Sequence, residues 1–209
     1  MTQIMTALET ITDGQIENVV NKVRDAMRKH RSEIRSDIAQ QVLGVENLGM
    51  MMFAPFRERV EIVSNLIVRK VKVNRTRTPQ EALDATGCKQ CTDRRVVDSM
   101  PKAETDEVNV VFFKPDFSKS NGHITDDDLE KEFNLRSLKP ADPISVAAVN
   151  EADYAFADEK PHGTHWKNAD GEWCYATFYR RIDGERRVFV DRRGSCGWSD
   201  CWWFAGLAS

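Results

Sequence analysis

The chain lacks the features that mark several common classes of protein. Its five cysteines form no regular framework over 209 residues, which indicates a reduced protein rather than a disulfide scaffold. No apolar run approaches the ~20 residues that a membrane helix needs, so we expect no membrane partner. The N-terminus has no basic segment followed by an apolar one. The sequence therefore shows no secretory signal, and we expect a cytoplasmic protein.

Excess charge and catalytic motifs are also missing. The net charge is -3 and the pI about 5.9, so bulk electrostatics favour neither a nucleic acid nor a membrane. The sequence contains no glycine-rich phosphate loop, nucleophile elbow or metalloprotease helix. His162 and His165 precede Cys174 but lie in a Pro-Gly segment, and we interpret them as loop histidines with local hydrogen bonds. We therefore expect no enzymatic activity, no catalytic residue and no cofactor.

Residues 1–70 are predicted to form a helical N-terminal region. Apolar residues recur at three- and four-residue steps from Asp13, which would cap a first helix, to Gly44, which would end it. The basic cluster at 28–31 is interpreted as a solvated face of this helix. A second helix is expected after Pro55, with apolar positions at Val60, Val63, Leu66 and Ile67. The two helices could pair as a hairpin within one chain or across a homo-oligomer.

Strand and turn patterns dominate the rest of the chain, so the sequence predicts an α+β fold with a boundary near residue 70. Strands are expected at 71–73 and 107–113, helices after Thr78, after Thr125 and at 146–152, and hairpin turns at Asp170-Gly171 and Asp183-Gly184.

A second interpretation rests on the cysteines. Cys88-Lys89-Gln90-Cys91 has the spacing of half a zinc site. The other half would have to be Cys196 and Cys201, which are separated by four residues rather than two. A zinc-stabilised module that binds protein or nucleic acid is therefore the alternative, and we expect no metal site.

Tryptophan is absent from the first three quarters of the chain. All five tryptophans occur at or after position 166, and between them residues 186–193 alternate like a strand. One face would carry a regular framework, and the other face would carry residues without common chemistry. The first set is Arg186, Val188, Val190 and Arg192, and the second is Arg187, Phe189, Asp191 and Arg193. A miscellaneous, half-exposed face bracketed by large aromatic residues is typical of a binding surface.

Arginine pairs also recur in this segment, at 180–181, 186–187 and 192–193, among aromatic residues. Such a pattern could grip a single-stranded nucleic acid. Asp183, Glu185, Asp191 and Asp200 offset much of the charge and would repel phosphate, so we do not expect a nucleic-acid partner.

The C-terminal sequence Trp198-Ser199-Asp200-Cys201-Trp202-Trp203-Phe204-Ala205-Gly206 resembles the ends of variable proteins of diversity-generating retroelements. The motif Phe178-x-Arg180, Asp183 and Arg186-x-Val188-x-Val190-x-Arg192 resembles the framework of that family. Weaker likenesses at 78–87 and 161–166 extend the resemblance over about residues 71–209. The resemblance implies a C-type-lectin-like ligand-binding domain over 71–209, with a mixed, mostly antiparallel sheet whose last strands and loops carry a diversified surface.

In that family, a template RNA is copied with errors at adenines, and selected codons of the gene change. The resemblance therefore implies variable, ligand-binding positions within about residues 178–204. These are Tyr179, Arg181, Ile182, Arg187, Phe189, Asp191, Arg193, Gly194, Ser195, Cys196, Ser199 and Cys201. None of them is Lys, Gln, Glu, Met or Trp, which such codon changes cannot produce.

The resemblance also assigns roles within this region. Trp198, Trp202, Trp203 and Phe204 would form a fixed frame, whereas Cys196 and Cys201 would be products of variation rather than a metal pair. On this hypothesis the chain is a non-enzymatic binder of an unidentified ligand, which we expect to be a protein.

Overall fold

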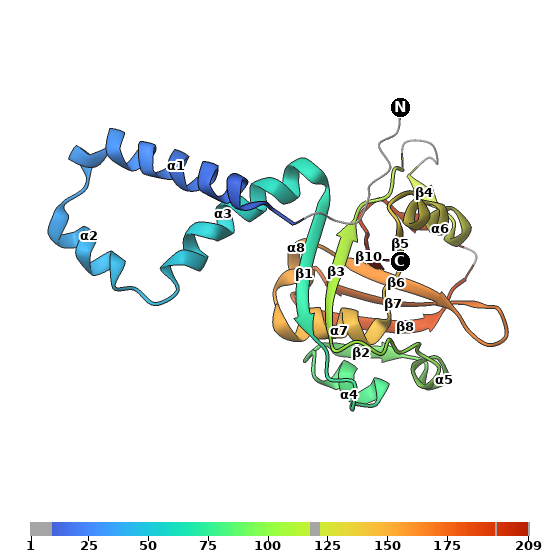
Figure 1. The fold of residues 1–209 in the computed structure, drawn as a ribbon. Helices are drawn as coiled ribbons and strands as arrows, with labels where there is room; N and C mark the ends of the chain where they lie inside the picture. Colours follow the sequence, from blue (N-terminus) through green and yellow to red (C-terminus); the bar gives the residue numbers. More distant parts are fainter. Residues whose placement is uncertain (1–9, 118–121, 195, 209) are drawn as a thin grey trace. The chain divides into compact units, whose positions relative to one another are not determined.

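The computed structural model describes residues 10–117, 122–194 and 196–208. The chain divides into two compact units, one ending at Ser64 and one beginning at Asn65. Figure 1 shows both units, and each is described by itself below. The sequence placed this boundary near residue 70. In the structure it lies a few residues earlier, because the first strand already begins at Leu66.

The first unit consists of helices. Its elements are α1 (Asp13–Lys29), the 3-10 turn η1 (Arg31–Glu33), α2 (Ser36–Leu43) and α3 (Leu48–Ser64). Thr12, rather than Asp13, caps α1, and it forms a capping box with Gln15. No residue of α1, η1 or α2 is buried. None of the helices in the described part of the chain is long and apolar enough to cross a membrane.

Three sequence predictions for this region are wrong. The single helix expected from Asp13 to Gly44 is broken after Lys29, within the basic cluster; in a continuous helix Arg28 and Arg31 would be neighbours three residues apart and would repel each other. Pro55 lies inside α3 rather than before it. Leu66 and Ile67 belong to a strand, because Asn65 adopts a φ of 52° that ends the helix and the following residues pair with Phe112 and Phe113.

The second unit is a mixed α+β domain around a large, mostly antiparallel sheet. Its strands are β1 (Leu66–Lys72), β2 (Lys89–Thr92), β3 (Glu107–Phe113), β4 (His123–Ile124), β5 (Leu138–Pro140), β6 (His162–Lys167), β7 (Trp173–Arg180), β8 (Arg186–Arg192), β9 (Trp198–Ser199) and β10 (Trp203–Ala208). The main sheet has eight strands in the order β1-β3-β10-β6-β7-β8-β2, with β5 also paired to β10. Among the strand pairs of the described residues, only β6–β10 and β2–β8 are parallel. Strands β4 and β9 form a separate antiparallel pair.

Five helices cover the sheet: α4 (Pro79–Asp84), α5 (Arg94–Asp98), α6 (Asp126–Leu135), α7 (Pro143–Ala152) and α8 (Phe156–Glu159). The expected caps are confirmed at Thr78, which forms a capping box with Glu81, and at Thr125. The expected strand at 107–113 matches β3, and the expected helix at 146–152 lies within α7.

Two apolar clusters form the core, one for each face of the sheet. Helices α4, α5, α7 and α8 contribute to the larger cluster, which includes Phe112, Phe178 and Val188. Helix α6 contributes Leu129 and Phe133 to the smaller cluster. That smaller cluster also contains Ile124, Trp198 and Phe204, so the β4–β9 pair and the last strand share one core with α6. Trp198 and Trp202 thereby pack on the side of the sheet opposite to α7, whereas Trp203 belongs to the larger cluster with α7.

Candidate ligand-binding site

The β7–β8 hairpin presents two chemically different faces. Val188 and Val190 are completely buried, whereas Arg187 and Phe189 are half-buried and Asp191 is exposed. The alternation predicted from the sequence for this strand is therefore confirmed. The hairpin turn at Asp183-Gly184 is confirmed as well, with Gly184 at a φ of 87° that favours glycine.

Contacts on the far side of the hairpin hold its framework residues in place. The guanidinium of Arg186 bonds the carboxylate of Asp158 and lies 3.8 Å from the ring centroid of Tyr154. Arg192 pairs with Asp93 at 2.9 Å and with Glu172 at 3.2 Å. These contacts fix the hairpin backbone without using the residues of the opposite face.

A pocket of about 270 Å³ opens on that opposite face. Its lining comes from β7, β8 and the segment that follows: Tyr175, Thr177, Tyr179, Phe189, Arg193, Gly197, Trp198, Ser199 and Trp202. The ring of Tyr179 stacks on Phe189 with centroids 5.8 Å apart and meets Trp202 edge to face at 5.7 Å. Trp202 in turn contacts Trp198 at 6.2 Å. The walls are therefore a connected set of aromatic rings, with hydroxyl groups and one guanidinium between them.

Arg193 is the cationic group of this pocket. Its guanidinium carbon lies 3.8 Å from the ring centroid of Trp198, and its Nε is 3.4 Å from a carboxylate oxygen of Asp126. Within the described part of the chain, its buried Nε and Nη2 have no hydrogen-bond acceptor. The guanidinium is thus held by stacking on Trp198 and by the charge of Asp126 rather than by hydrogen bonds.

Asp126, in the first turn of α6, supports the floor of the pocket. It accepts hydrogen bonds of 2.8 Å from Trp198 Nε1 and from His165 Nδ1. The other ring nitrogen of His165 is 2.8 Å from Glu130, one helical turn further along α6. The two carboxylates thus hold the imidazole between them, in a buried network that reaches the pocket through Trp198 and Arg193.

The charges in this network stabilise one another. Burial acts to lower the pKa of His165, but its hydrogen bonds to Asp126 and Glu130 outweigh burial and raise that pKa. Burial acts to raise the pKa of Asp126, yet hydrogen bonds from His165 and Trp198 outweigh it and lower that pKa. The contacts within the network therefore favour the imidazolium of His165 and the carboxylate of Asp126.

Strand β2 extends the exposed face beyond the region that the sequence singled out. Its parallel pairing with β8 places Lys89 and Cys91 in register with Arg187 and Phe189, on the same face. Glu185 joins this edge through ion pairs to Lys89 and Arg187. Sequence reasoning missed this edge because a parallel pairing between distant segments leaves no local pattern.

The structure brings many, but not all, of the expected variable positions together. Tyr179, Phe189, Arg193 and Ser199 line the pocket, and Arg187 and Asp191 share its face. Arg181 and Ile182 lie in the β7–β8 turn, where Ile182 is fully exposed.

The remaining expected positions flank the pocket or cannot be placed. Gly194, Cys196 and Cys201 are exposed in the segments around β9. Ser195 lies outside the described residues. The pocket residues Tyr175 and Thr177 were not expected, although their alternation with Tyr179 along one strand is the signal that could have found them.

The four frame residues behave in two ways. Trp198, Trp203 and Phe204 are buried, with exposed fractions of 2%, 8% and 0%. Trp202 is only half-buried and forms part of the pocket wall. A role in holding the backbone therefore fits the first three, whereas Trp202 faces the pocket.

Neither histidine lies in a loop, so that sequence interpretation is wrong. His162 and His165 belong to β6 and are completely buried, because β6 runs between β7 and β10. His162 Nδ1 donates to the carbonyl of Lys160 at 2.7 Å, and its Nε2 accepts from Asn150 at 2.9 Å. Burial lowers the pKa of His162 to about 4, which keeps this imidazole neutral.

The cysteines and the arginine pairs are the residues on which the two alternative interpretations rest. Cys88 and Cys91 are half-buried, Cys196 and Cys201 are exposed, and the described residues contain no group of three or more His, Cys, Asp or Glu that could hold a metal. Each arginine of the three pairs has a carboxylate within 4 Å. Their charge is therefore largely offset on the molecule itself.

Comparison of the chain with protein-family models, with curated proteins and with solved structures finds no match.

Proposed function

We propose that this chain is a non-enzymatic ligand-binding protein whose second unit is a C-type-lectin-like domain, and that a retroelement diversifies its binding surface. One observation carries the proposal. Side chains of six expected variable positions share one face of the β7–β8 hairpin or line its pocket, while the framework residues are fixed by separate contacts on the other side.

This separation matters because a diversified surface must change without unfolding the protein. Tyr179, Arg187, Phe189 and Asp191 are all at least partly exposed, and none belongs to either buried core cluster. Most surface substitutions change stability by about 0.5 kcal/mol or less. The backbone that carries them is fixed by Val188, Val190 and the tryptophans instead.

The pocket also suggests what kind of group it takes. Aromatic walls favour an apolar or aromatic group, and the guanidinium of Arg193 favours a carboxylate or another acceptor beside it. A side chain protruding from a protein surface, next to an acidic residue, meets both requirements. Protein ligands are therefore the class we propose.

Sequencing of the DNA around this gene tests the diversification directly. We expect a second copy of the segment that encodes residues 178–204, close to a reverse transcriptase gene, and differing at adenines in the codons of the exposed face. A second copy with changes in the codons of Val188 and Val190 as often as in those of Arg187 and Phe189 would contradict the proposal, and so would the lack of any copy.

A binding measurement tests the surface itself. A library in which Tyr179, Arg187, Phe189 and Asp191 are varied is displayed and selected against several unrelated proteins. We expect binders to each target, with parent-like thermal stability. A matched library at Lys70, Lys72, Glu107 and Asn109, exposed on β1 and β3 at the other end of the sheet, is the control and should give none.

A further inference from the structure

The helical unit exposes an unusual amount of apolar surface. Its exposed large apolar side chains are Ile11, Ile16, Val20, Val23, Met27, Ile34, Ile38, Val42, Leu43, Val45, Met50, Met51, Met52, Phe53 and Val60. No residue between 10 and 60 is buried. Helices of this length are marginal in water unless an apolar face is packed. The unit therefore has an apolar surface that could form a core only when another surface packs against it.

The apolar residues of α1 form a seam with the spacing of a coiled coil. Ile16, Val20, Val23 and Met27 follow one another at steps of four, three and four, and they are 37% to 52% exposed. A groove of about 440 Å³ runs beside this seam, lined by Val20, Val23 and Met27 and by Met52 of α3.

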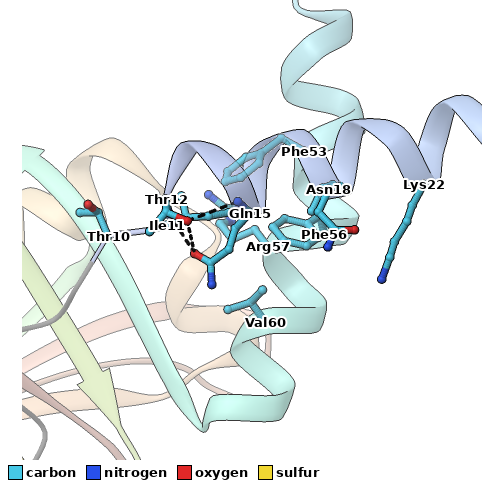
Figure 2. A pocket seen from close by; sticks show the side chains of 11 residues that line it. Thr10, Ile11, Thr12, Gln15, Asn18, Lys22, Phe53, Phe56, Arg57 and Val60 are labelled. Carbon is cyan, nitrogen blue, oxygen red and sulfur yellow. Dashed lines mark hydrogen bonds between the residues drawn. The ribbon is translucent and has the colours of Figure 1, made fainter.

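Another side of α1 carries a second, larger groove of about 720 Å³ toward α3. Figure 2 shows Phe53, Phe56 and Val60 of α3 facing the first turns of α1, where Thr12 and Gln15 are bonded to each other. Helix α3 thus lies along one flank of α1 and leaves the seam of α1 open to a further helix.

The charges of α1 specify which helix fits that seam. Its first half carries the acidic residues Asp13 and Glu17. Its second half is mainly basic, with Lys22, Arg24, Arg28 and Lys29 against one acidic residue, Asp25, which pairs with Arg28. The described residues give neither Glu17 nor Arg24 an ion-pair partner within the chain. A copy of α1 laid antiparallel on the first would bring acidic and basic ends together at both ends of the seam.

We propose that two copies of this chain pair through α1, antiparallel and about a two-fold axis. Ile16 then packs in one layer with Met27 of the second copy, and Val20 with Val23. Glu17 flanks the seam next to Arg24 of the second copy, and the same pair recurs across the axis. A parallel arrangement would leave Glu17 and Arg24 of the second copy about two helical turns apart along the seam and would form no such pair.

The available surface is sufficient for this assembly. A 17-residue helix is about 25 Å long, and two helices side by side are about 20 Å wide. The face is therefore roughly 500 Å² per copy, or about 1,000 Å² in total, which reaches the lower limit for a specific interface. The assembly would present two ligand-binding domains on one particle and would strengthen attachment to a repetitive target.

Sedimentation velocity of the full chain over a wide range of concentration tests the pairing. We expect a species of twice the chain mass of 23.9 kDa that dissociates on dilution. The double substitution Val20→Glu and Val23→Glu should give a monomer. Glutamate has a higher helix propensity than valine, so a poorer helix cannot explain that loss. Gly14→Glu, on α1 but outside the seam, adds a side chain in open space and should remain a dimer.

The charge pair tests the orientation. Glu17→Arg should raise the dimer dissociation constant by about tenfold, and Glu17→Arg combined with Arg24→Glu should restore it. A wild-type chain that stays monomeric, or a seam variant that stays dimeric, would overturn the pairing. A double charge variant no tighter than the single one would overturn the antiparallel arrangement.

Tryptophan fluorescence provides the folding control for all of these variants. Every tryptophan lies at or after position 166, so the signal reports only on the second unit. It should be identical in the monomeric and dimeric forms.

Discussion

At the scale of single residues, His162 is a neutral imidazole enclosed by protein. Its pKa falls from 6.5 to about 4 on folding, so the unfolded chain binds more protons between these two values. The contribution of His162 to stability is therefore complete above pH 6.5 and decreases toward pH 4, by about 3 kcal/mol for a shift of this size. We expect His162→Gln to remove most of this acid-side loss. Urea unfolding, followed by tryptophan fluorescence at a series of pH values, measures it.

His165 provides the internal contrast for that experiment. Its pKa is raised in the folded chain, so its contribution is complete below the unfolded value of 6.5 and is lost as the pH rises through the folded value. As the pH rises, His162 therefore increases the stability of the folded chain, whereas His165 decreases it. If the stability of His162→Gln fell between pH 6.5 and 4 as steeply as that of the parent, the neutral assignment of His162 would be wrong.

Two tryptophans of the pocket differ in what they support. Trp198 is 2% exposed and donates to Asp126, so Trp198→Ala should destabilise the domain by about 3–5 kcal/mol. Trp202 is half-buried, and Trp202→Ala should cost no more than about 2 kcal/mol while it removes one wall of the pocket. Chemical denaturation of both variants decides this. Equal losses would mean that the pocket wall is part of the core.

At the scale of the strand, the exposed face of β8 should tolerate exchange. We expect Arg187→Ser, Phe189→Ser and Asp191→Ser together to lower the melting temperature by only a few degrees, because their side chains leave the core clusters intact. Arg193→Ser should lower it further on its own, since Arg193 joins Trp198 to Asp126. Differential scanning calorimetry compares the two. A larger drop for the triple variant would show that this face is structural.

Arg193 therefore differs from the other candidate binding residues, because it also has a structural role that the sequence could not show. Alternation along the strand places Arg193 with Arg187, Phe189 and Asp191, as a surface residue. Its partner Asp126 belongs to a helix far away in sequence, and only the packing of α6 against the hairpin brings the two together. The period of a strand predicts which face a residue takes, but not what lies on that face.

Local chemistry explains which elements could be predicted. The caps at Thr78 and Thr125 and the β-branched run of β3 are encoded within a few residues, and these elements appear where expected. Leu66 and Ile67 continue a helical spacing, and only their pairing with β3 makes them a strand. The site divides in the same manner, since the β8 face follows from alternation whereas the β2 edge and the α6 support depend on long-range pairing.

At the scale of the whole molecule, the two units differ in how each one is stabilised internally. Every buried residue in the described part of the chain lies between Ile67 and Leu207. The second unit thus has a complete core of its own, and a chain that begins at Asn65 should fold without the helices. We expect its unfolding, followed by tryptophan fluorescence, to match that of the full chain within about 1 kcal/mol, which is a small part of the stability of a domain.

The isolated helical unit should behave in the opposite way. Because residues 10–60 contain no buried side chain, its helicity should depend on concentration and should vanish on dilution, as for helices that fold only when paired. Circular dichroism of a peptide spanning residues 10–64, measured over a series of dilutions, reads this out. Helicity that is independent of concentration would mean that α1 and α3 are stable without a partner. Loss of tryptophan-reported stability in the chain that begins at Asn65 would mean that the second unit relies on the helices.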